Sequence, residues 1–166
     1  MTDALNVIPN ENPVATGVRD TAALAKALSN VLADTYRLTF KTHAYHWNVE
    51  GPLFYSIHKL TEEQYENMFD AADEVAERIR SLGHLAPSQM SEIMELSVIK
   101  DLEGEISAAG MIEDLAADHE RVAHRLHALT EMAGDRKDVV TEDLATERSA
   151  FHEQAAWMLR AIAKSS

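Results

Sequence analysis

Four long stretches of the chain carry apolar residues at the three- and four-residue spacing of an α-helix, and this pattern limits the fold more than any other feature. They span about residues 20–48, 56–82, 111–134 and 144–162. Each stretch has a single apolar stripe, so the four helices are expected to pack together as an all-α four-helix bundle. Only six glycines and four prolines occur in 166 residues, which also favours helices.

The connections between these stretches differ in length. Tight turns are expected around residues 51–52 and 134–135, where a glycine precedes Pro or Asp. About 20 residues separate the second helix from the third, which is enough to run from one end of the bundle to the other. Within that connection, residues 88–96 predict a short extra helix with Ser88 or Ser91 as its N-cap.

The domain boundaries follow from the same pattern. Residues 1–19 contain Asn and Pro without helical periodicity, and we expect them to form an extended, flexible arm. Residues 20–166 are expected to form one domain, because this length suffices for a single core. Gly83 is expected to end the second helix in the left-handed conformation, and Gly134 is expected to close the third.

Composition excludes several classes of protein. Fifteen Lys and Arg against 28 Asp and Glu leave a formal net charge of −13, which argues against a nucleic-acid surface and favours attraction of cations. The absence of cysteine excludes disulfide scaffolds and thiolate metal sites. No stretch approaches the ~20 apolar residues of a membrane span, and no signal peptide is evident, so a cytoplasmic protein is expected.

Histidines and carboxylates are concentrated between residues 43 and 77. His58 and Glu62 are four residues apart, as are Asp73 and Glu77, so each pair shares a helix face. The four residues fall within an arc of about 100° around one helix. Imidazole and carboxylate ligands without thiolate suit iron, manganese or zinc. The pattern therefore predicts a metal site.

The spacing also shows that one helix cannot complete this site. Glu62 and Asp73 are eleven residues apart, which is ~16 Å along a helix and too far for ligands of one metal ion. If two antiparallel copies of the helix face each other about a two-fold axis, His58 and Glu62 of one copy lie opposite the Asp and Glu pair of the other copy. Bundles that bind two metals within one chain use Glu-x-x-His pairs, and none of the eight histidines follows a Glu at that spacing. A site shared between two subunits is therefore favoured.

The same segment resembles the Dps family of mini-ferritins. It follows the pattern His-Trp-Asn-x-x-Gly-x-x-Phe-x-x-x-His, then an acidic residue four positions on, then Asp-x-x-x-Glu-Arg. The resemblance covers about residues 20–164 and includes the short extra helix. The matching residues are His46, Trp47, Asn48, Gly51, Phe54, His58, Glu62, Asp73, Glu77 and Arg78.

This resemblance implies a ferritin-like fold, a hollow homododecamer built from two-fold dimers, and a ferroxidase that oxidises Fe(II) with hydrogen peroxide or oxygen and stores Fe(III) mineral, protecting against oxidative stress. It implies that His46, His58 and Glu62 bind two irons from one subunit, with Asp73 and Glu77 contributed by the other. Zinc or another divalent metal is expected to substitute for iron. Position 62 is more often Asp in this family, so the longer Glu62 changes how the second iron is held.

Two neighbours of the ligands have alternative interpretations. The resemblance suggests that Trp47 intercepts stray oxidants, while plain packing in a dimer interface is equally consistent with its position. His43 lies three residues before His46, and we expect it to support the site or the interface rather than bind metal.

An acidic cluster opens the fourth helix. Acidic residues at a helix N-terminus are favourable in themselves. The resemblance implies instead that this region lines channels through which Fe(II) enters, a role we favour most for Asp143. The cluster comprises Asp138, Glu142, Asp143 and Glu147.

The remaining histidines predict no further metal site. His119, His124 and His127 form a second cluster in the sequence, and His124 and His127 share a helix face, but solvated side chains are expected there. His84 and His152 lie elsewhere.

Two rival functions are disfavoured. Many members of the family bind DNA through Lys-rich arms, but residues 1–20 hold one Arg against three acids, a net charge of −2 that repels phosphates. DNA binding that compacts and physically protects the nucleoid is therefore not expected. A purely structural helical module with a vestigial metal stripe is disfavoured by the completeness of the ligand set.

Overall fold

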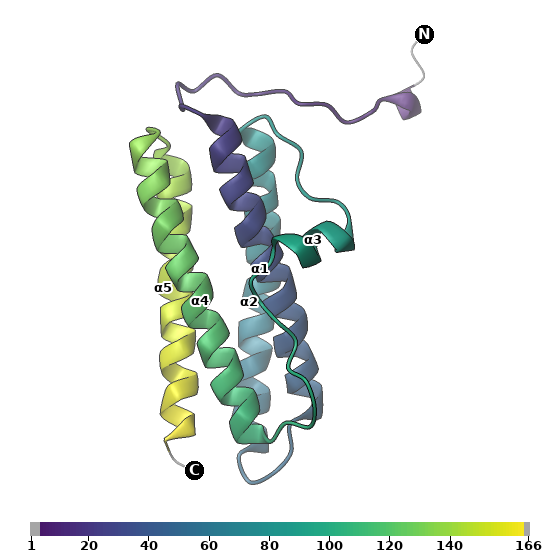
Figure 1. Ribbon diagram of the computed structural model, residues 1–166, viewed down its shortest axis with the longest axis vertical. Coiled ribbons are helices and arrows are strands. Elements are labelled where there is room, and N and C mark those ends of the chain that lie inside the picture. The colour runs from purple at the N-terminus through teal and green to yellow at the C-terminus, as the bar shows by residue number, and fades with distance from the viewer. Residues whose placement is uncertain (1–3, 165–166) are drawn as a thin grey trace.

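The computed structural model describes residues 4–164, and over that range the chain forms helices without strands (Figure 1). This confirms the all-α prediction, including the short helix in the long connection. The elements are the 3-10 turn η1 (Ala4–Asn6) and the helices α1 (Thr21–Asn48), α2 (Phe54–Ser81), α3 (Met90–Leu96), α4 (Ala108–Asp135) and α5 (Val139–Ala163).

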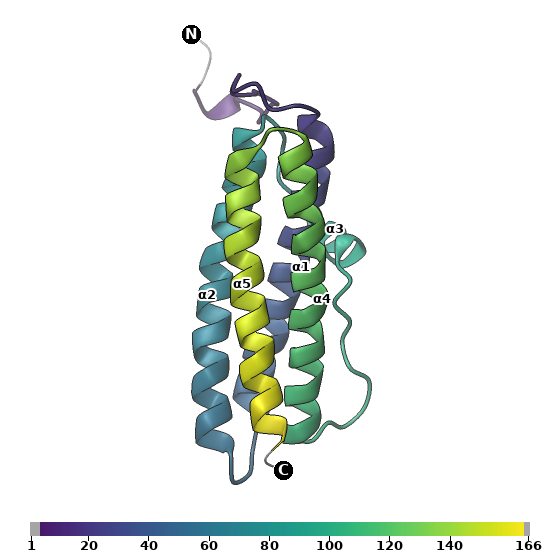
Figure 2. The same cartoon turned by 90° about the vertical axis from the view of Figure 1, so that its left-hand side faces the viewer.

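The four long helices form two antiparallel pairs. Helix α1 packs along α2, α4 packs along α5, and contact between α1 and α4 joins the pairs (Figures 1 and 2). The segment from residue 82 to residue 107 carries α3 across α1 and runs the length of the bundle, so α4 begins at the end opposite to that at which α2 stops. This single long crossover is the predicted topology.

The core consists of one contiguous cluster of apolar side chains between the four helices. Leu28 and Leu38 of α1, Met68 of α2, Leu126 of α4 and Leu159 of α5 are almost fully buried. Each such side chain contributes about 1.5–3 kcal/mol to folding through burial. Within residues 4–164, none of the helices combines the length and apolar character needed to cross a bilayer.

The long connection is attached to the bundle by a buried carboxylate. Asp34 of α1 is fully buried and accepts hydrogen bonds from Ser97 Oγ and Val98 N, both at 2.8 Å. Arg125 of α4 approaches the other oxygen of Asp34 at 2.7 Å. Burial raises the pKa of Asp34, although the Arg125 guanidinium opposes that effect. These contacts fasten the connection to both α1 and α4.

Of the two glycines predicted to end helices, only Gly83 does so. Gly83 has φ +94° and follows the end of α2, as predicted, with Gly83 N bonded to Arg80 O. The expectation for Gly134 is wrong, because Gly134 lies within α4 and the left-handed residue is Lys137, with φ +60°. The Lys137 and Asp138 amides bond back to carbonyls in the last turn of α4, so the backbone closes the helix around a lysine at the position usually held by glycine.

Helix α3 also begins differently from the prediction. Its N-cap residue is Gln89, which makes no side-chain capping bond. Ser88 precedes the cap, and its amide donates to Glu92 at 3.3 Å, while Ser91 lies within the helix. The prediction of Ser88 or Ser91 as the cap is therefore wrong, because the helix begins at Met90, so Ser88 lies one residue before the cap position and Ser91 lies in the first turn.

The N-terminal arm is extended after η1 and lies across one end of the bundle (Figure 1). Asn12 N donates to Gly83 O at 3.1 Å, and Arg19 N donates to Arg136 O at 2.9 Å. A Cβ atom on Gly83 would come within 2.5 Å of Pro13 Cα, so the arm packs closely on this glycine. Residues 10–20 thus make specific contacts, while residues 1–3 and 165–166 lie outside the described range.

Candidate metal centre

Two histidines from different helices meet where α1 turns back into α2. His46 lies in the last turn of α1, His58 lies near the start of α2, and their rings stack with centroids 3.7 Å apart. His46 Nδ1 contacts the His58 carbonyl at 2.8 Å, and His58 Nδ1 contacts the His46 carbonyl at 3.0 Å. Because a carbonyl only accepts, each Nδ1 carries the proton and each Nε2 keeps a lone pair for a metal.

A buried threonine lies against this histidine pair. Thr61 is fully buried, donates to the Ile57 carbonyl at 2.7 Å, and lies 3.4 Å from His46 Nδ1. His46 itself is only 7% exposed, so its ring has little freedom to turn. The stack is therefore held in place before any metal arrives.

Glu62 lies one helical turn beyond His58, on the same face of α2. Its carboxylate contacts Lys59 Nζ at 2.5 Å. The hydrogen bond from the Lys59 ammonium holds the pKa of Glu62 below its usual value, with partial burial acting in the opposite direction. Glu62 is consequently ionised at neutral pH, and a metal ion at this position would compete with Lys59 for it.

Asp73 and Glu77 lie further along α2 and face solvent. Within residues 4–164, neither carboxylate takes part in a hydrogen bond or an ion pair, and no three His, Asp or Glu side chains of one chain converge closely enough to hold a metal ion. One protomer thus brings His46 and His58 together, leaves Glu62 one turn away, and keeps Asp73 and Glu77 apart from all three.

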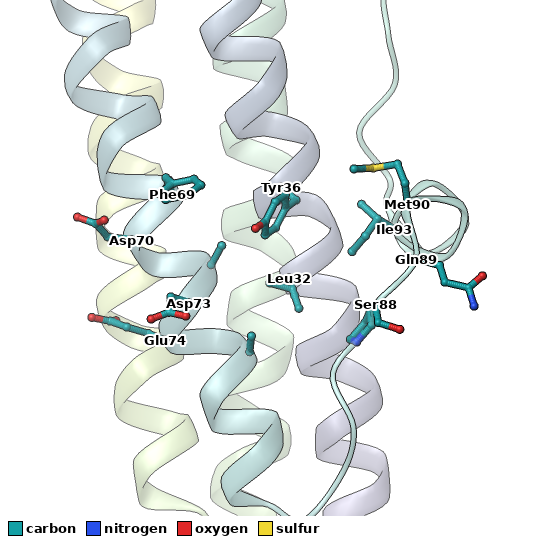
Figure 3. A pocket seen from close by; sticks show the side chains of 13 residues that line it. Leu32, Tyr36, Phe69, Asp70, Asp73, Glu74, Ser88, Gln89, Met90 and Ile93 are labelled. Carbon is teal, nitrogen blue, oxygen red and sulfur yellow. The ribbon is translucent and has the colours of Figure 1, made fainter. Parts of the chain in front are cut away.

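The Asp73 end of this face borders an open groove of about 770 Å³. Figure 3 shows Asp73 on α2 at one side of the groove, Tyr36 on α1 at its floor, and Met90 on α3 at the far side. Phe69 and Met90 are 60% and 67% exposed, and Phe40 on α1 is 65% exposed. Exposed aromatic and apolar side chains thus lie on the α1–α2 pair together with the candidate ligands, and such side chains commonly pack against a partner.

Aromatic rings extend the histidine stack sideways. The His43 ring lies 4.1 Å from the Trp47 ring and 4.1 Å from the Tyr65 ring, and the Tyr65 ring lies 5.2 Å from His46. His43 is thus enclosed between aromatic rings, 5.9 Å from His46. Tyr65 was not among the predicted site residues, although its position seven residues after His58 places it on the same helix face.

Comparison with known proteins identifies the family. A model of the ferritin-like domain matches residues 25–165. DNA protection during starvation protein 2 of Bacillus anthracis is 35% identical over 137 residues, covering 82% of this chain and 94% of that protein. The Dps crystal structure from Staphylococcus aureus superposes with a TM-score of 0.84 at 29% identity, covering 88% of this chain and 97% of that one. The chain belongs to the Dps family of mini-ferritins.

Dps membership supports a general role in iron storage and in protection against oxidative stress. The Dps protein of Vibrio cholerae, which is described as one of the ferritin-like diiron-carboxylate proteins, has a TM-score of 0.81 and 28% identity, covering 89% of this chain and 98% of that one. This family relationship implies that the chain binds iron.

Arg78, the last residue of the Dps-like pattern, does not face the candidate site. Its guanidinium donates to Asp138 at 2.6 Å and to Thr141 Oγ1 at 2.9 Å. Asp138 is 1% exposed and caps α5 by accepting from Thr141 N. Arg78 therefore ties α2 to the beginning of α5.

The acidic cluster of α5 divides into two kinds of residue. Asp138 is buried in the cap just described, so its carboxylate does not face solvent in the protomer, and a channel role does not fit it. Asp143 and Glu147 are exposed, and Glu142 is half-buried. The channel prediction is thus retained for these three only.

The second histidine cluster is not a cluster in space, which corrects that interpretation. His119 is fully buried and contacts His152 through the two Nδ1 atoms at 2.8 Å. His124 and His127 lie on the surface, and His127 pairs with Glu153 at 2.7 Å. Desolvation, together with the nearby Arg148 charge, lowers the pKa of His119 to about 3. The helix turns His119 toward the core, whereas the other two point outward.

Proposed function

We propose that this Dps protein is a ferroxidase that oxidises Fe(II) with hydrogen peroxide, or with oxygen, at di-iron sites shared between two subunits. The Fe(III) product is stored as mineral inside a dodecameric shell in the cytoplasm. The observation that carries this proposal is the reciprocal anchoring of His46 and His58, which frees both Nε2 atoms as ligands at one end of the apolar face.

The ligand chemistry fits this reaction. His46, His58 and Glu62 of one protomer offer two imidazole nitrogens and a carboxylate, and the partner's Asp73 and the partner's Glu77 add two carboxylates. Carboxylate oxygens favour Fe(III) over Fe(II), so they ease the loss of an electron. Peroxide takes one electron from each of two Fe(II) ions and leaves as water, which avoids release of hydroxyl radical.

The geometry of one protomer supports the sharing of sites. Asp73 and Glu77 carry no partner in the described part of the chain, and they lie ~16 Å and ~22 Å from Glu62 along α2. Two protomers packed antiparallel through their α1–α2 faces would cover the exposed Phe40, Phe69 and Met90 and would form two identical sites.

The site assignment is tested by peroxide-driven Fe(II) oxidation in a double variant, His46→Ala with Glu62→Ala. We expect loss of the fast phase, because the variant lacks an imidazole and a carboxylate ligand. A control is His127→Ala with Glu153→Ala, which removes the same two residue types at an exposed pair away from the site, and it should oxidise iron at the wild-type rate. Equal rates in the site variant and the control would reject the assignment.

Mixed assemblies test whether the site is shared. His46→Ala subunits and Asp73→Ala/Glu77→Ala subunits are each expected to be inactive alone. In a mixed dimer, one shared site combines the His46→Ala change with the Asp73→Ala/Glu77→Ala changes, and the other shared site contains only wild-type ligands. Co-refolded mixtures should therefore regain activity. Mixtures that remain inactive although mixed dimers have formed would contradict a shared site.

The assembly and the metal can be examined separately. A native mass near twelve times 18.4 kDa is expected for the shell. Zn(II) takes the same ligands without redox chemistry, so it should compete with Fe(II) and slow oxidation in wild type. A dimer that never assembles further would exclude the shell.

A further inference from the structure

A buried positive charge without a carboxylate partner lies between α2 and α5. Arg148 of α5 is only 6% exposed, and its guanidinium donates to Asn67 Oδ1 of α2 at 2.8 Å. Among residues 4–164, no Asp or Glu forms an ion pair with Arg148. A guanidinium keeps its charge in proteins, and a buried charge is costly unless an opposite charge compensates it. The surroundings of Arg148 therefore call for an anion.

A groove of about 330 Å³ opens beside this guanidinium, between α2 and α5, which lie next to each other in Figure 2. Asn67 and Phe151 line the groove, and both touch Arg148, whose guanidinium carbon lies 4.5 Å from the centre of the Phe151 ring. Gln64 of α2 lines the same groove and is 3% exposed. Neither its Nε2 nor its Oε1 has a hydrogen-bond partner within the described residues. An uncompensated charge and an unpartnered amide thus meet at one groove.

We propose that the α2–α5 groove binds a small inorganic monoanion, such as chloride, between the Gln64 amide and the Arg148 charge. The Gln64 NH2 group is a donor that an anion can accept from. Because Asn67 Oδ1 already accepts from Arg148, the Asn67 NH2 group is available as a second donor. The anion would join α2 to α5 along a boundary where the two helices make little direct contact. This site is separate from the proposed ferroxidase centre and does not depend on it.

The surrounding carboxylates limit the charge of the anion. Glu63 lines the groove and is exposed, so it can turn its carboxylate toward solvent. Glu147 and Glu74 act on Arg148 at longer range, where they oppose the lowering of its pKa by burial. One guanidinium against these nearby negative charges favours an anion of single charge, because a dianion such as sulfate would meet twice the repulsion.

The buried histidines beside Arg148 do not change this balance. Desolvation is the main cause that lowers the pKa of His119 and of His152, and the Arg148 charge lowers both further. Both imidazoles are therefore neutral at pH 7, and the charge of Arg148 stands alone in this part of the core.

Anomalous diffraction tests the site directly. Crystals of the assembled protein soaked in bromide, the heavier analogue of chloride, should give an anomalous peak in the groove. Arg148→Met keeps a long side chain without the charge, and its crystals should lack the peak. The matched control is Arg160→Met, which changes a more exposed arginine of the same helix and should retain the peak.

A second measurement follows stability in solution. Sodium gluconate is replaced by sodium chloride at constant ionic strength and fixed protein concentration, so that only the size of the anion changes. The urea midpoint of wild type and of Arg160→Met should rise until the site is saturated, whereas the midpoint of Arg148→Met should not move. Gln64→Leu breaks no hydrogen bond within the described residues, and it should respond more weakly than wild type.

Two results would overturn the proposal. One is a wild-type groove without bromide, and the other is a chloride response that Arg148→Met retains in full. If Arg148→Met does not assemble, Gln64→Leu decides the question, because a bromide peak and a chloride response equal to those of wild type would show that the groove does not hold the anion.

Discussion

At the scale of single residues, two histidine pairs show how environment decides the role of one side-chain type. His46 and His58 donate through Nδ1 to backbone carbonyls, which leaves both Nε2 atoms available at the edge of the bundle. His119 and His152 contact each other through Nδ1 inside the core, so one must donate and the other accept. The first pair keeps two ring nitrogens free for a ligand, and the second holds α4 against α5.

The buried pair predicts a specific acid sensitivity. The pKa of His119 is about 3 in the folded chain against 6.5 as its ordinary value, so the unfolded chain binds a proton that the folded chain excludes. Neutral His119 therefore adds its full share to the free energy of unfolding above pH 6.5. That share is lost as the pH falls toward 3, at about 1.4 kcal/mol per pH unit. The variant His119→Asn, whose amide can still meet His152, should flatten the pH dependence of the unfolding midpoint in urea between pH 7 and 5.

A surface histidine provides the control for this prediction. His127 has a side chain that is 57% exposed, and His127→Asn should leave the pH dependence as it is in wild type. Identical slopes for wild type and His119→Asn, measured at one protein concentration, would show that the buried imidazole does not set the acid sensitivity.

At the scale of secondary-structure elements, one ion pair joins two helices that otherwise make little contact. Arg78 projects from α2 to the first turn of α5, where Asp138 accepts from Arg78 and from the Thr141 amide. Burial tends to raise the pKa of Asp138, but the hydrogen bonds from Arg78 and Thr141 outweigh it and hold the pKa below its usual value. Asp138 thus serves as helix cap and counter-ion together.

Removal of this carboxylate should destabilise the protomer. Asp138→Ala deprives α5 of its N-cap and leaves the Arg78 guanidinium, which is 15% exposed, without its partner. The combined cost is about 3 kcal/mol in the free energy of unfolding. Chemical denaturation should show this loss for Asp138→Ala and almost none for Asp143→Ala, whose side chain is exposed on the same helix. Similar losses in both variants would contradict a special role for the cap.

At the scale of the whole molecule, the net charge of −13 is the property that assembly would multiply. Asp73 and Glu77 account for part of it on the α1–α2 face, and Asp143 and Glu147 for another part on α5. In the proposed shell, these groups would draw Fe(II) toward the sites and would repel polyanions.

Iron entry is expected to depend on the exposed part of the α5 cluster. Asp143→Asn removes one charge per subunit without touching a buried contact, so it should slow Fe(II) uptake at low iron while the shell stays assembled and folded. Glu113→Gln, an exposed neutralisation on α4, is the matched control and should take up iron normally. Unchanged uptake in Asp143→Asn would remove this residue from the proposed channel.

The arm predicts the behaviour of the shell toward DNA. Its charged residues include Glu11 and Asp20 against Arg19, and it is partly docked on the bundle through Asn12. An acidic arm repeated around the shell repels the phosphate backbone. We therefore expect no gel shift with metal-free, magnesium-free protein at neutral pH and moderate salt, and a retarded DNA band would contradict this.

The fold was largely predictable because the spacing of apolar residues within each helix is a local feature of the sequence. Apolar spacing located all four long helices, and the same spacing placed Glu62 and Asp73 too far apart for one metal ion. Helix ends were less predictable, because several neighbouring residues can adopt the terminating backbone conformation or bond the free amides at a helix end. Gly134 stays helical while Lys137 takes the left-handed position, and Glu92 satisfies the amide of Ser88 near the start of α3.

The sequence by itself determined which residues form helices and which ligands share a helix face, since both follow from the repeat of a single helix. Only the tertiary structure decided that the His46 and His58 rings stack, that Tyr65 reaches His43, and that His119 is buried against His152. Those contacts join different helices, and their geometry depends on how the helices pack and rotate against each other, which no spacing within one helix specifies.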